Sequence, residues 1–237
     1  MRYMGNKRRI VNDILPVILA AWKPGQSYVE PFCGSCSVIQ KVPKDLKRIA
    51  NDNNRYLIAM WSKLTTTNWQ PPTKIDKSFY DRVRDSWHND DGKYDDALIG
   101  WVGFMASRSG RFFDGGYSGT IKDRDHIGES IRNITAQIPE LKGIEWQTGD
   151  YSKMIIPDKS LIYCDPPYKG TKTYSTSRNF DYPAFYDWCR TKSVEGHTVF
   201  VSEYSMPSDF IPVWSKQVTV SVGTYKTYYP TETLFKK

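Results

Sequence analysis

The sequence predicts an α/β fold in which a mainly parallel sheet carries a helical insertion. Short apolar runs with strand character alternate with segments of helical spacing, and this alternation is typical of parallel strands joined by helices. The segment 65–142 interrupts the alternation with helical patches and a glycine-rich loop at 107–120. Strands are expected at 26–31, 47–51, 143–148, 161–164, 198–202 and 217–222, with 232–235 as an added edge strand.

Helices are expected in the amino-terminal region and in the insertion. Ile10, Ile14, Val17, Ile18 and Ala21 follow helical spacing, and a short helix is expected after Cys36. We therefore expect one sheet-forming domain from residues 1–64 and 143–237, with 65–142 inserted into it. The remaining helices are expected at 56–64, 79–87, 97–106 and 127–138.

Composition and charge narrow the class of protein. The 237 residues are 39% hydrophobic and 25% charged, which is typical of a globular chain of one large domain or a domain with an insertion. The net charge of +7 favours a polyanionic partner without identifying it. Cys33 and Cys36 form a C-x-x-C, but no second pair follows at zinc-site spacing, so no metal is expected. No apolar stretch is long enough to span a membrane, so we expect a soluble cytoplasmic protein.

The tetrapeptide Asp165-Pro166-Pro167-Tyr168 follows the apolar run 161–163 and is expected at the carboxyl end of a strand. Two prolines stiffen this tip and donate no backbone hydrogen bonds. Open α/β sheets bind their ligands at such strand ends. The group suits an aromatic amine, because the ring can stack on a base while Asp165 and the Pro166 carbonyl accept the two amine hydrogens.

A second candidate site begins at the loop after the first expected strand. Gly34 is placed where a backbone must approach a ligand closely, ahead of a helix amino terminus. Asp52 lies 18 residues further on, at the end of the next strand, where an acidic residue typically holds ribose hydroxyls. A cofactor that contains a nucleoside fits this pair.

These motifs together resemble the Dam-type (D12 class) DNA adenine-N6 methyltransferases of phages and bacteria. The resemblance is carried by Glu30-Pro31-Phe32-Cys33-Gly34, by Asn51-Asp52, by the tetrapeptide, by Gly149-Asp150 and by Arg2-Tyr3-Met4-Gly5-Asn6-Lys7, in the family's order. It implies a Rossmann-like S-adenosylmethionine-dependent sheet at 1–64 and 143–237, with a DNA target-recognition region at 65–142. One departure is Cys36, which stands where the family usually has a second glycine.

The resemblance also implies roles for individual residues. Pro31, Phe32 and Gly34 line the cofactor loop, Asp52 takes the ribose hydroxyls, and Asp150 takes the cofactor adenine amine. Asp165 serves both the cofactor site and the catalytic tetrapeptide. Tyr3 and Lys7 contact S-adenosylmethionine, Lys7 near its methionine end.

The residue types explain the expected chemistry. The adenine amine is a poor nucleophile because its lone pair is delocalised into the ring, and acceptors at Asp165 and Pro166 would localise that pair. The leaving group is a neutral thioether, so alignment and electrostatics supply much of the rate. Methylation of cytosine N4, of RNA adenine or of a protein amide, and a non-catalytic DNA-binding module, remain the alternatives.

Basic and aromatic residues mark the expected contacts with double-stranded DNA. Arginine is the usual reader of guanine edges and an aromatic ring can wedge into a base stack, although a solvated loop over core phenylalanines is the alternative for the insertion. The segment 169–178 is expected to close over the flipped base. We expect no membrane contact and no obligate protein partner. The expected DNA-binding residues are Arg108, Arg111, Phe112, Lys122, Arg124, Lys172 and Arg178.

Overall fold

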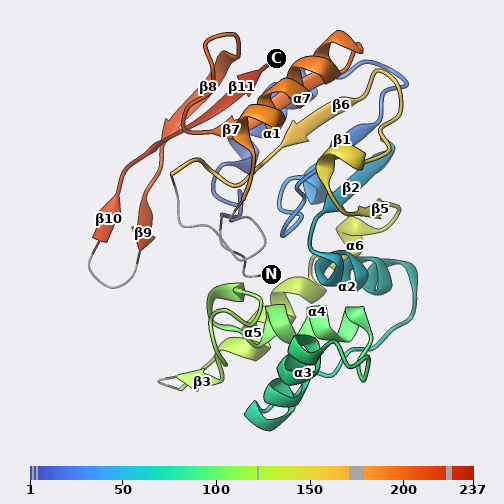
Figure 1. Ribbon diagram of the computed structural model, residues 1–237, viewed down its shortest axis with the longest axis vertical. Helices are drawn as coiled ribbons and strands as arrows, with labels where there is room; N and C mark the ends of the chain where they lie inside the picture. The colour runs from blue at the N-terminus through green and yellow to red at the C-terminus, as the bar shows by residue number, and fades with distance from the viewer. Residues whose placement is uncertain (2, 4, 122, 171–178, 223–225) are drawn as a thin grey trace.

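The computed structural model describes residues 1, 3, 5–121, 123–170, 179–222 and 226–237. Its centre is a seven-stranded sheet in the order β5-β2-β1-β6-β7-β11-β8 (Figure 1). The first five strands in that order are parallel, and β11 runs antiparallel to both of its neighbours. The strands are β1 (Tyr28–Glu30), β2 (Arg48–Asp52), β5 (Glu145–Thr148), β6 (Leu161–Cys164), β7 (Thr198–Glu203), β8 (Ile211–Gln217) and β11 (Thr231–Lys236).

Helices cover both faces of the sheet, because successive side chains of each buried strand point to opposite sides. In β6, Leu161 and Tyr163 join a hydrophobic cluster that includes α1 (Val11–Leu19) and α2 (Arg55–Thr66). The alternate residues Ile162 and Cys164 join a second cluster, which includes α7 (Tyr182–Val194). Figure 1 shows α7 and α1 on opposite sides of the sheet.

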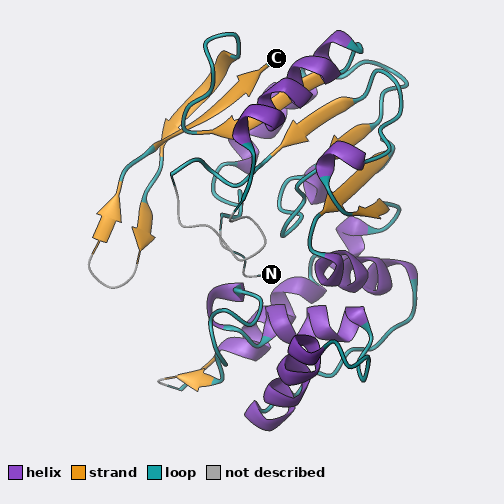
Figure 2. Cartoon of the chain, in the orientation of Figure 1, coloured by secondary structure: helices purple, strands orange, loops and turns teal. Residues whose placement is uncertain are grey.

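The insertion is mainly helical and lies at the end of the molecule beyond β5 (Figure 2). Its rings and aliphatic side chains, among them Trp101, Val102, Phe104 and Ile134, belong to the same hydrophobic cluster as α1 and α2. One continuous core therefore joins the insertion to the sheet. The assignment of this region to DNA recognition stays a prediction. Its elements are α3 (Lys77–Asn89), α4 (Asp96–Met105), η2 (Arg108–Gly110), β3 (Thr120–Ile121), β4 (Arg124–Asp125), α5 (His126–Thr135) and α6 (Ile138–Leu141).

Three expectations about strands and helices were wrong. The segment 232–235 is not an edge strand, because β11 lies between β7 and β8. The expected strand 217–222 is divided, since β8 ends at Gln217 and β9 (Val220–Val222) pairs with β10 (Lys226–Tyr228) in a separate ribbon. The expected helix after Cys36 is only one 3-10 turn, η1 (Ile39–Lys41), as is η3 (Tyr151–Lys153) further along the chain.

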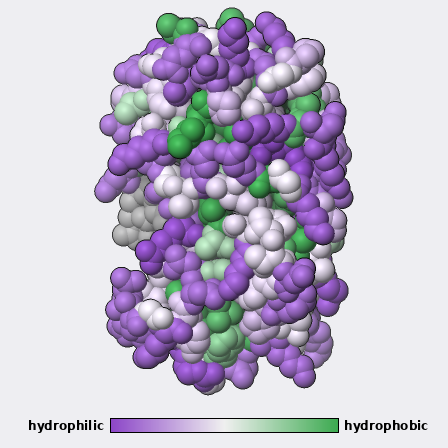
Figure 3. All heavy atoms as spheres, turned by 90° about the vertical axis from the view of Figure 1, so that its right-hand side faces the viewer, coloured by the Kyte–Doolittle hydropathy of each residue, from purple (hydrophilic) through white to green (hydrophobic). Residues whose placement is uncertain are grey.

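The surface is mostly hydrophilic where it can be seen. Figure 3 shows scattered hydrophobic residues among hydrophilic ones on the side that includes α2 and β5. Within the described residues, no helix is long and apolar enough to cross a membrane.

Candidate active site

Most of the residues expected to form the site lie in loops at one edge of the sheet. The loops after β1, β2, β5 and β6 leave the carboxyl ends of parallel strands, which meet at the same edge. They carry Gly34, Asp150 and the tetrapeptide that starts at Asp165, and Asp52 is the last residue of β2. Lys7 reaches the same edge from the segment before α1.

The Asp165 carboxyl group forms a buried ion pair with Lys7. Lys7 Nζ lies 2.7 Å from Asp165 Oδ1, and the Lys7 side chain is only 8% exposed. The same ammonium lies 4.5 Å from the centre of the Tyr168 ring, a distance at which a cation is attracted to the ring face. Lys7 thus contacts the carboxylate and the ring that the sequence predicts for the target base.

Burial dominates the electrostatics of this pair. Desolvation raises the pKa of Asp165 to about 6, because the charged form loses water, while the Lys7 ammonium opposes that rise. The pKa of Lys7 is raised, since the neighbouring carboxylates outweigh the cost of burying its charge. Asp165 therefore becomes an ionised acceptor only above mildly acidic pH.

Two carboxyl groups that the sequence analysis missed complete the surroundings of Tyr168. Glu232, at the start of β11, accepts a hydrogen bond from the Tyr168 hydroxyl and lies 3.5 Å from Lys7 Nζ. Glu203, at the end of β7, accepts the Lys169 backbone N–H at 2.6 Å and so fixes the chain just after the tetrapeptide. Neither residue lies in a motif; their positions at strand ends of the same edge were the available signal.

The glycine loop is built around a tight approach of Tyr3. Gly34 has a φ of +46°, and a Cβ atom there would lie 3.0 Å from the Tyr3 ring. The Gly34 carbonyl accepts the Trp61 indole N–H at 3.3 Å, which ties the loop to α2. A side chain at position 34 would be strained and would displace Tyr3.

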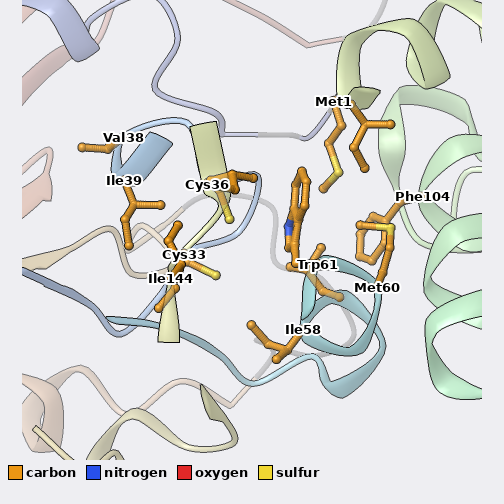
Figure 4. Close-up of a cluster of buried hydrophobic side chains, with 14 of the residues drawn as sticks. Met1, Cys33, Cys36, Val38, Ile39, Ile58, Met60, Trp61, Phe104 and Ile144 are labelled. Atoms are coloured by element: carbon orange, nitrogen blue, oxygen red, sulfur yellow. The ribbon is translucent and has the colours of Figure 1, made fainter. Parts of the chain in front are cut away.

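Cys36 occupies a backbone conformation that favours glycine. Its φ is +56°, and its side chain is fully buried beside Trp61 (Figure 4). This conformation gives a physical reason for the usual glycine at this position. Burial also raises the pKa of the Cys33 and Cys36 thiols, which disfavours the reactive thiolate.

Asp52 is held in place by backbone donors. Its Oδ2 accepts the Gly34 N–H at 3.0 Å, and its Oδ1 accepts the Asn54 N–H at 2.9 Å. Burial raises its pKa, and these hydrogen bonds oppose the rise. Asn51, next to it, donates its side-chain amide to the carbonyls of Pro31 and Gly149 at 3.0 and 2.9 Å, and so ties three loops together.

The remaining predicted cofactor residues lie on the β5 side of this edge. Asp150 is exposed, and its Oδ1 accepts hydrogen bonds from the N–H and hydroxyl of Ser152 at 2.8 and 2.5 Å. The Phe32 ring packs against Tyr151 and Phe180, at centroid distances of 5.1 and 5.8 Å. The side-chain-free Gly34 and the oriented Asp52 carboxylate thus fit a nucleoside-containing cofactor.

The predicted DNA-binding residues of the insertion differ in their surroundings. Arg108 is exposed, whereas the Phe112 ring packs against Tyr56 and Phe104 with centroid distances of 5.4 and 5.0 Å. Arg124 makes a bidentate ion pair with Glu129 at 2.8 and 2.9 Å.

Arg111 donates to the Asp114 carbonyl at 3.2 Å. Lys122, Lys172 and Arg178 lie outside the described residues. DNA contact by any of the predicted residues stays a prediction.

The family model of the D12 class N6 adenine-specific DNA methyltransferases matches residues 3–94. Over these residues the chain is similar to that family. The match covers Tyr3, Lys7, Gly34 and Asp52, and the expected enzyme class and S-adenosylmethionine cofactor agree with this family. The strand order, with its antiparallel hairpin at one end, is typical of S-adenosylmethionine-dependent methyltransferases.

One solved structure and the curated proteins were also compared with this chain. The crystal structure of SMU.472, a candidate methyltransferase complexed with SAH, matches with a TM-score of 0.38 and 11% sequence identity. The match covers 99% of this chain and 53% of that chain, so this chain spans about half the length of that protein. No curated protein matches the chain.

Proposed function

We propose that this chain transfers a methyl group from S-adenosylmethionine to the N6 amine of adenine within a specific short sequence of duplex DNA. The observation that carries the proposal is the buried Asp165 carboxylate beside Tyr168, at the same sheet edge as the Gly34 loop and Asp52. The family matched by residues 3–94 has the same activity in its description.

The target adenine must leave the duplex before it can reach this edge, at a cost of about a few kcal/mol. Stacking on the Tyr168 ring offsets part of that cost. The Lys7 ammonium lies 4.5 Å from the centre of that ring, and Tyr204 packs against it in a T-shaped arrangement with the centroids 4.8 Å apart. Asp165 and the Pro166 carbonyl then accept the two amine hydrogens and localise the nitrogen lone pair.

When bound, S-adenosylmethionine would provide a methyl group on a positively charged sulfur, with a neutral thioether as the leaving group. Gly34 and Asp52 would hold its nucleoside part, with Asp150 at the adenine end and Tyr3 and Lys7 at the other. As the new N6–carbon bond forms, both bonding electrons come from the amine. The surplus amine proton leaves through Asp165, whose pKa of about 6 suits a transient acceptor.

The insertion supplies several of the proposed DNA contacts. Its exposed Arg108 is free of the packing that holds Phe112, and the chain's net charge of +7 favours a polyanion. We propose that the protein recognises a short DNA sequence and flips the target base out of the duplex.

The test is nucleoside mass spectrometry after incubation of unmethylated duplex DNA with the protein and S-adenosylmethionine. We expect N6-methyladenine at one short sequence, and none with Asp165→Ala. Methylation confined to cytosine or to RNA would refute the proposal, as would binding of DNA without any methyl transfer by a protein that binds the cofactor.

A further inference from the structure

Glu232 connects the two predicted catalytic side chains through a single carboxyl group. It accepts the Tyr168 hydroxyl and lies 3.5 Å from the Lys7 ammonium, which is itself 2.7 Å from Asp165. Its side chain is 7% exposed, so these contacts are shielded from water. Among the described residues, Glu232 is the carboxyl group that contacts both Lys7 and Tyr168.

The ion pair of Lys7 with Asp165 weakens the acceptor that the proposed chemistry needs. Asp165 must accept a hydrogen bond from the target amine, and the Lys7 ammonium 2.7 Å from its Oδ1 stabilises the carboxylate charge and so makes it a poorer acceptor. A buried ammonium that lost its partner without another would be strongly disfavoured. Glu232 offers that other partner, because a movement of Lys7 Nζ by about one ångström would exchange the shorter contact for the longer one.

We propose that Glu232 is a positioning residue that shares Lys7 with Asp165 and takes over the ammonium when Asp165 accepts the target amine. This inference rests on the proposed function. Glu232 acts through Lys7 and through the Tyr168 hydroxyl, and it touches no reacting atom.

The other groups around Asp165 do not supply this exchange. Tyr163 shares a hydrogen bond of 2.8 Å with Ser202. Glu30 accepts the Tyr28 hydroxyl at 2.9 Å, and burial raises its pKa well above the ordinary value. Lys7 is the cation paired with Asp165, and it lowers the Asp165 pKa, whereas Glu232 raises it.

The deciding variant is Glu232→Gln, which keeps the shape and an acceptor for the Tyr168 hydroxyl but removes the charge. Ser202→Ala is the matched control, because it removes a buried hydrogen bond to a tyrosine on the neighbouring strand without touching Lys7. Lys7→Met is the opposite probe, since it removes the cation. Two readouts are used: the carboxyl titration of Asp165 by NMR of carbon-13-labelled protein, and the pH profile of single-turnover methylation.

We expect Glu232→Gln to lower the Asp165 pKa and to shift the acidic limb of the rate profile to lower pH. We expect its plateau rate to fall about tenfold or more, because Lys7 then stays on Asp165. Lys7→Met should raise the Asp165 pKa and shift the acidic limb of the rate profile to higher pH. Ser202→Ala should change neither quantity.

An Asp165 titration in Glu232→Gln that coincides with that of the wild-type protein would overturn the inference, as would a plateau rate within twofold of wild type. The NMR arm needs no turnover. A shifted titration in a protein that makes no N6-methyladenine would therefore reject the proposed function while retaining the shared ion pair.

Discussion

Asp165 and Asp52 are both carboxylates at strand ends, but their partners differ in kind. Asp165 faces a side-chain ammonium and an aromatic ring, whereas two backbone N–H groups fix both oxygens of Asp52. The first arrangement suits a group that changes partners during a reaction. The second suits a group that presents a constant surface to a ligand.

Exchange of either residue for alanine should separate these roles. Asp165→Ala should lower the methylation rate by about a hundredfold or more, because it removes an acceptor needed in the transition state, and should leave cofactor affinity largely intact. Asp52→Ala should weaken cofactor binding by about tenfold or more. Calorimetric titration with the cofactor and single-turnover rates measure the two effects. Equal losses of cofactor affinity in both variants would contradict this division.

Cys36 offers a second test at the scale of one residue. A left-handed conformation costs a residue with a Cβ atom about 1–2 kcal/mol, and glycine avoids that cost. Alanine at this position would keep the strain and lose the buried thiol. We therefore expect Cys36→Gly to be more stable than Cys36→Ala by about 1 kcal/mol in denaturant unfolding.

Cys189 is the control for this prediction, because it is also fully buried but lies inside helix α7. There the order should reverse, with glycine less stable than alanine by about 1 kcal/mol. The same order at both cysteines would show that backbone strain at Cys36 is unimportant.

At the scale of the strands, Asn51 aligns the loops of the proposed cofactor site. Its amide binds the loops after β1 and β5 while its own backbone carbonyl accepts the Cys33 N–H at 2.8 Å. Asn51→Ala should leave two carbonyl groups without this donor. We expect a loss of about 1–3 kcal/mol in stability and a weaker affinity for S-adenosylmethionine.

Gln147→Ala is the matched control, since Gln147 on β5 also makes two hydrogen bonds with backbone groups, both of Ile155 at 2.9 Å. Those hydrogen bonds join β5 to Ile155, which follows Asp150 and η3 in the chain. A loss of cofactor affinity in Gln147→Ala as large as that in Asn51→Ala would refute an aligning role for Asn51.

Strands buried on both faces were predictable, while the antiparallel end of the sheet was not. The apolar run 161–164 and the run 47–51 match β6 and β2 closely, because helices cover both sides of them. Strand β8 was missed because its residues are mostly exposed and include Pro212, so neither continuous apolarity nor alternation marks it. Helix α7 was missed because its described buried side chains are only Phe185 and Cys189.

The site was predictable to the extent that its residues lie in motifs. The tetrapeptide, Gly34 and Asp52 could be placed from strand ends, whereas Lys7 was placed only through the family resemblance. Glu203 and Glu232 were not found, because each is one acid among 26 acidic residues and acquires its partners only when β7 and β11 come together. Pairing of distant strands is information that local spacing does not contain.

At the scale of the whole molecule, the continuous core makes the insertion a rigid extension of the sheet. Trp101 and Phe104 of α4 share the cluster that holds Trp61 of α2, and the Tyr3 and Phe104 rings lie 6.0 Å apart. If the insertion contacts DNA, as we propose, that contact is held at a set position relative to Tyr3 and the Gly34 loop. This arrangement would suit recognition of bases at a set distance from the target adenine.

Arg108 is the insertion residue best placed to test that idea. If it binds a guanine edge, Arg108→Ala should cost about 1–3 kcal/mol and relax preference at one base pair. If it binds only phosphate, binding should weaken for every sequence and the salt slope should fall by about one unit. Methylation of a randomised duplex library at two salt concentrations measures both.

Arg124→Ala serves as a comparison, because Arg124 is already engaged with Glu129. We expect a smaller change in sequence preference than for Arg108→Ala. An unchanged preference in Arg108→Ala and in Arg111→Ala would move recognition to another part of the chain.

The position of β11 links enzyme assembly to the order of synthesis. This strand follows both of its neighbours, β7 and β8, in the chain, yet it must lie between them, and it brings Glu232 to Lys7. A nascent chain that has emerged only as far as β8 already holds the Gly34 loop, Asp52 and the tetrapeptide, but β7 presents an unpaired edge and Lys7 lacks its second carboxylate. The strand that completes the surroundings of Lys7 is therefore the last strand of the described sheet to be synthesised.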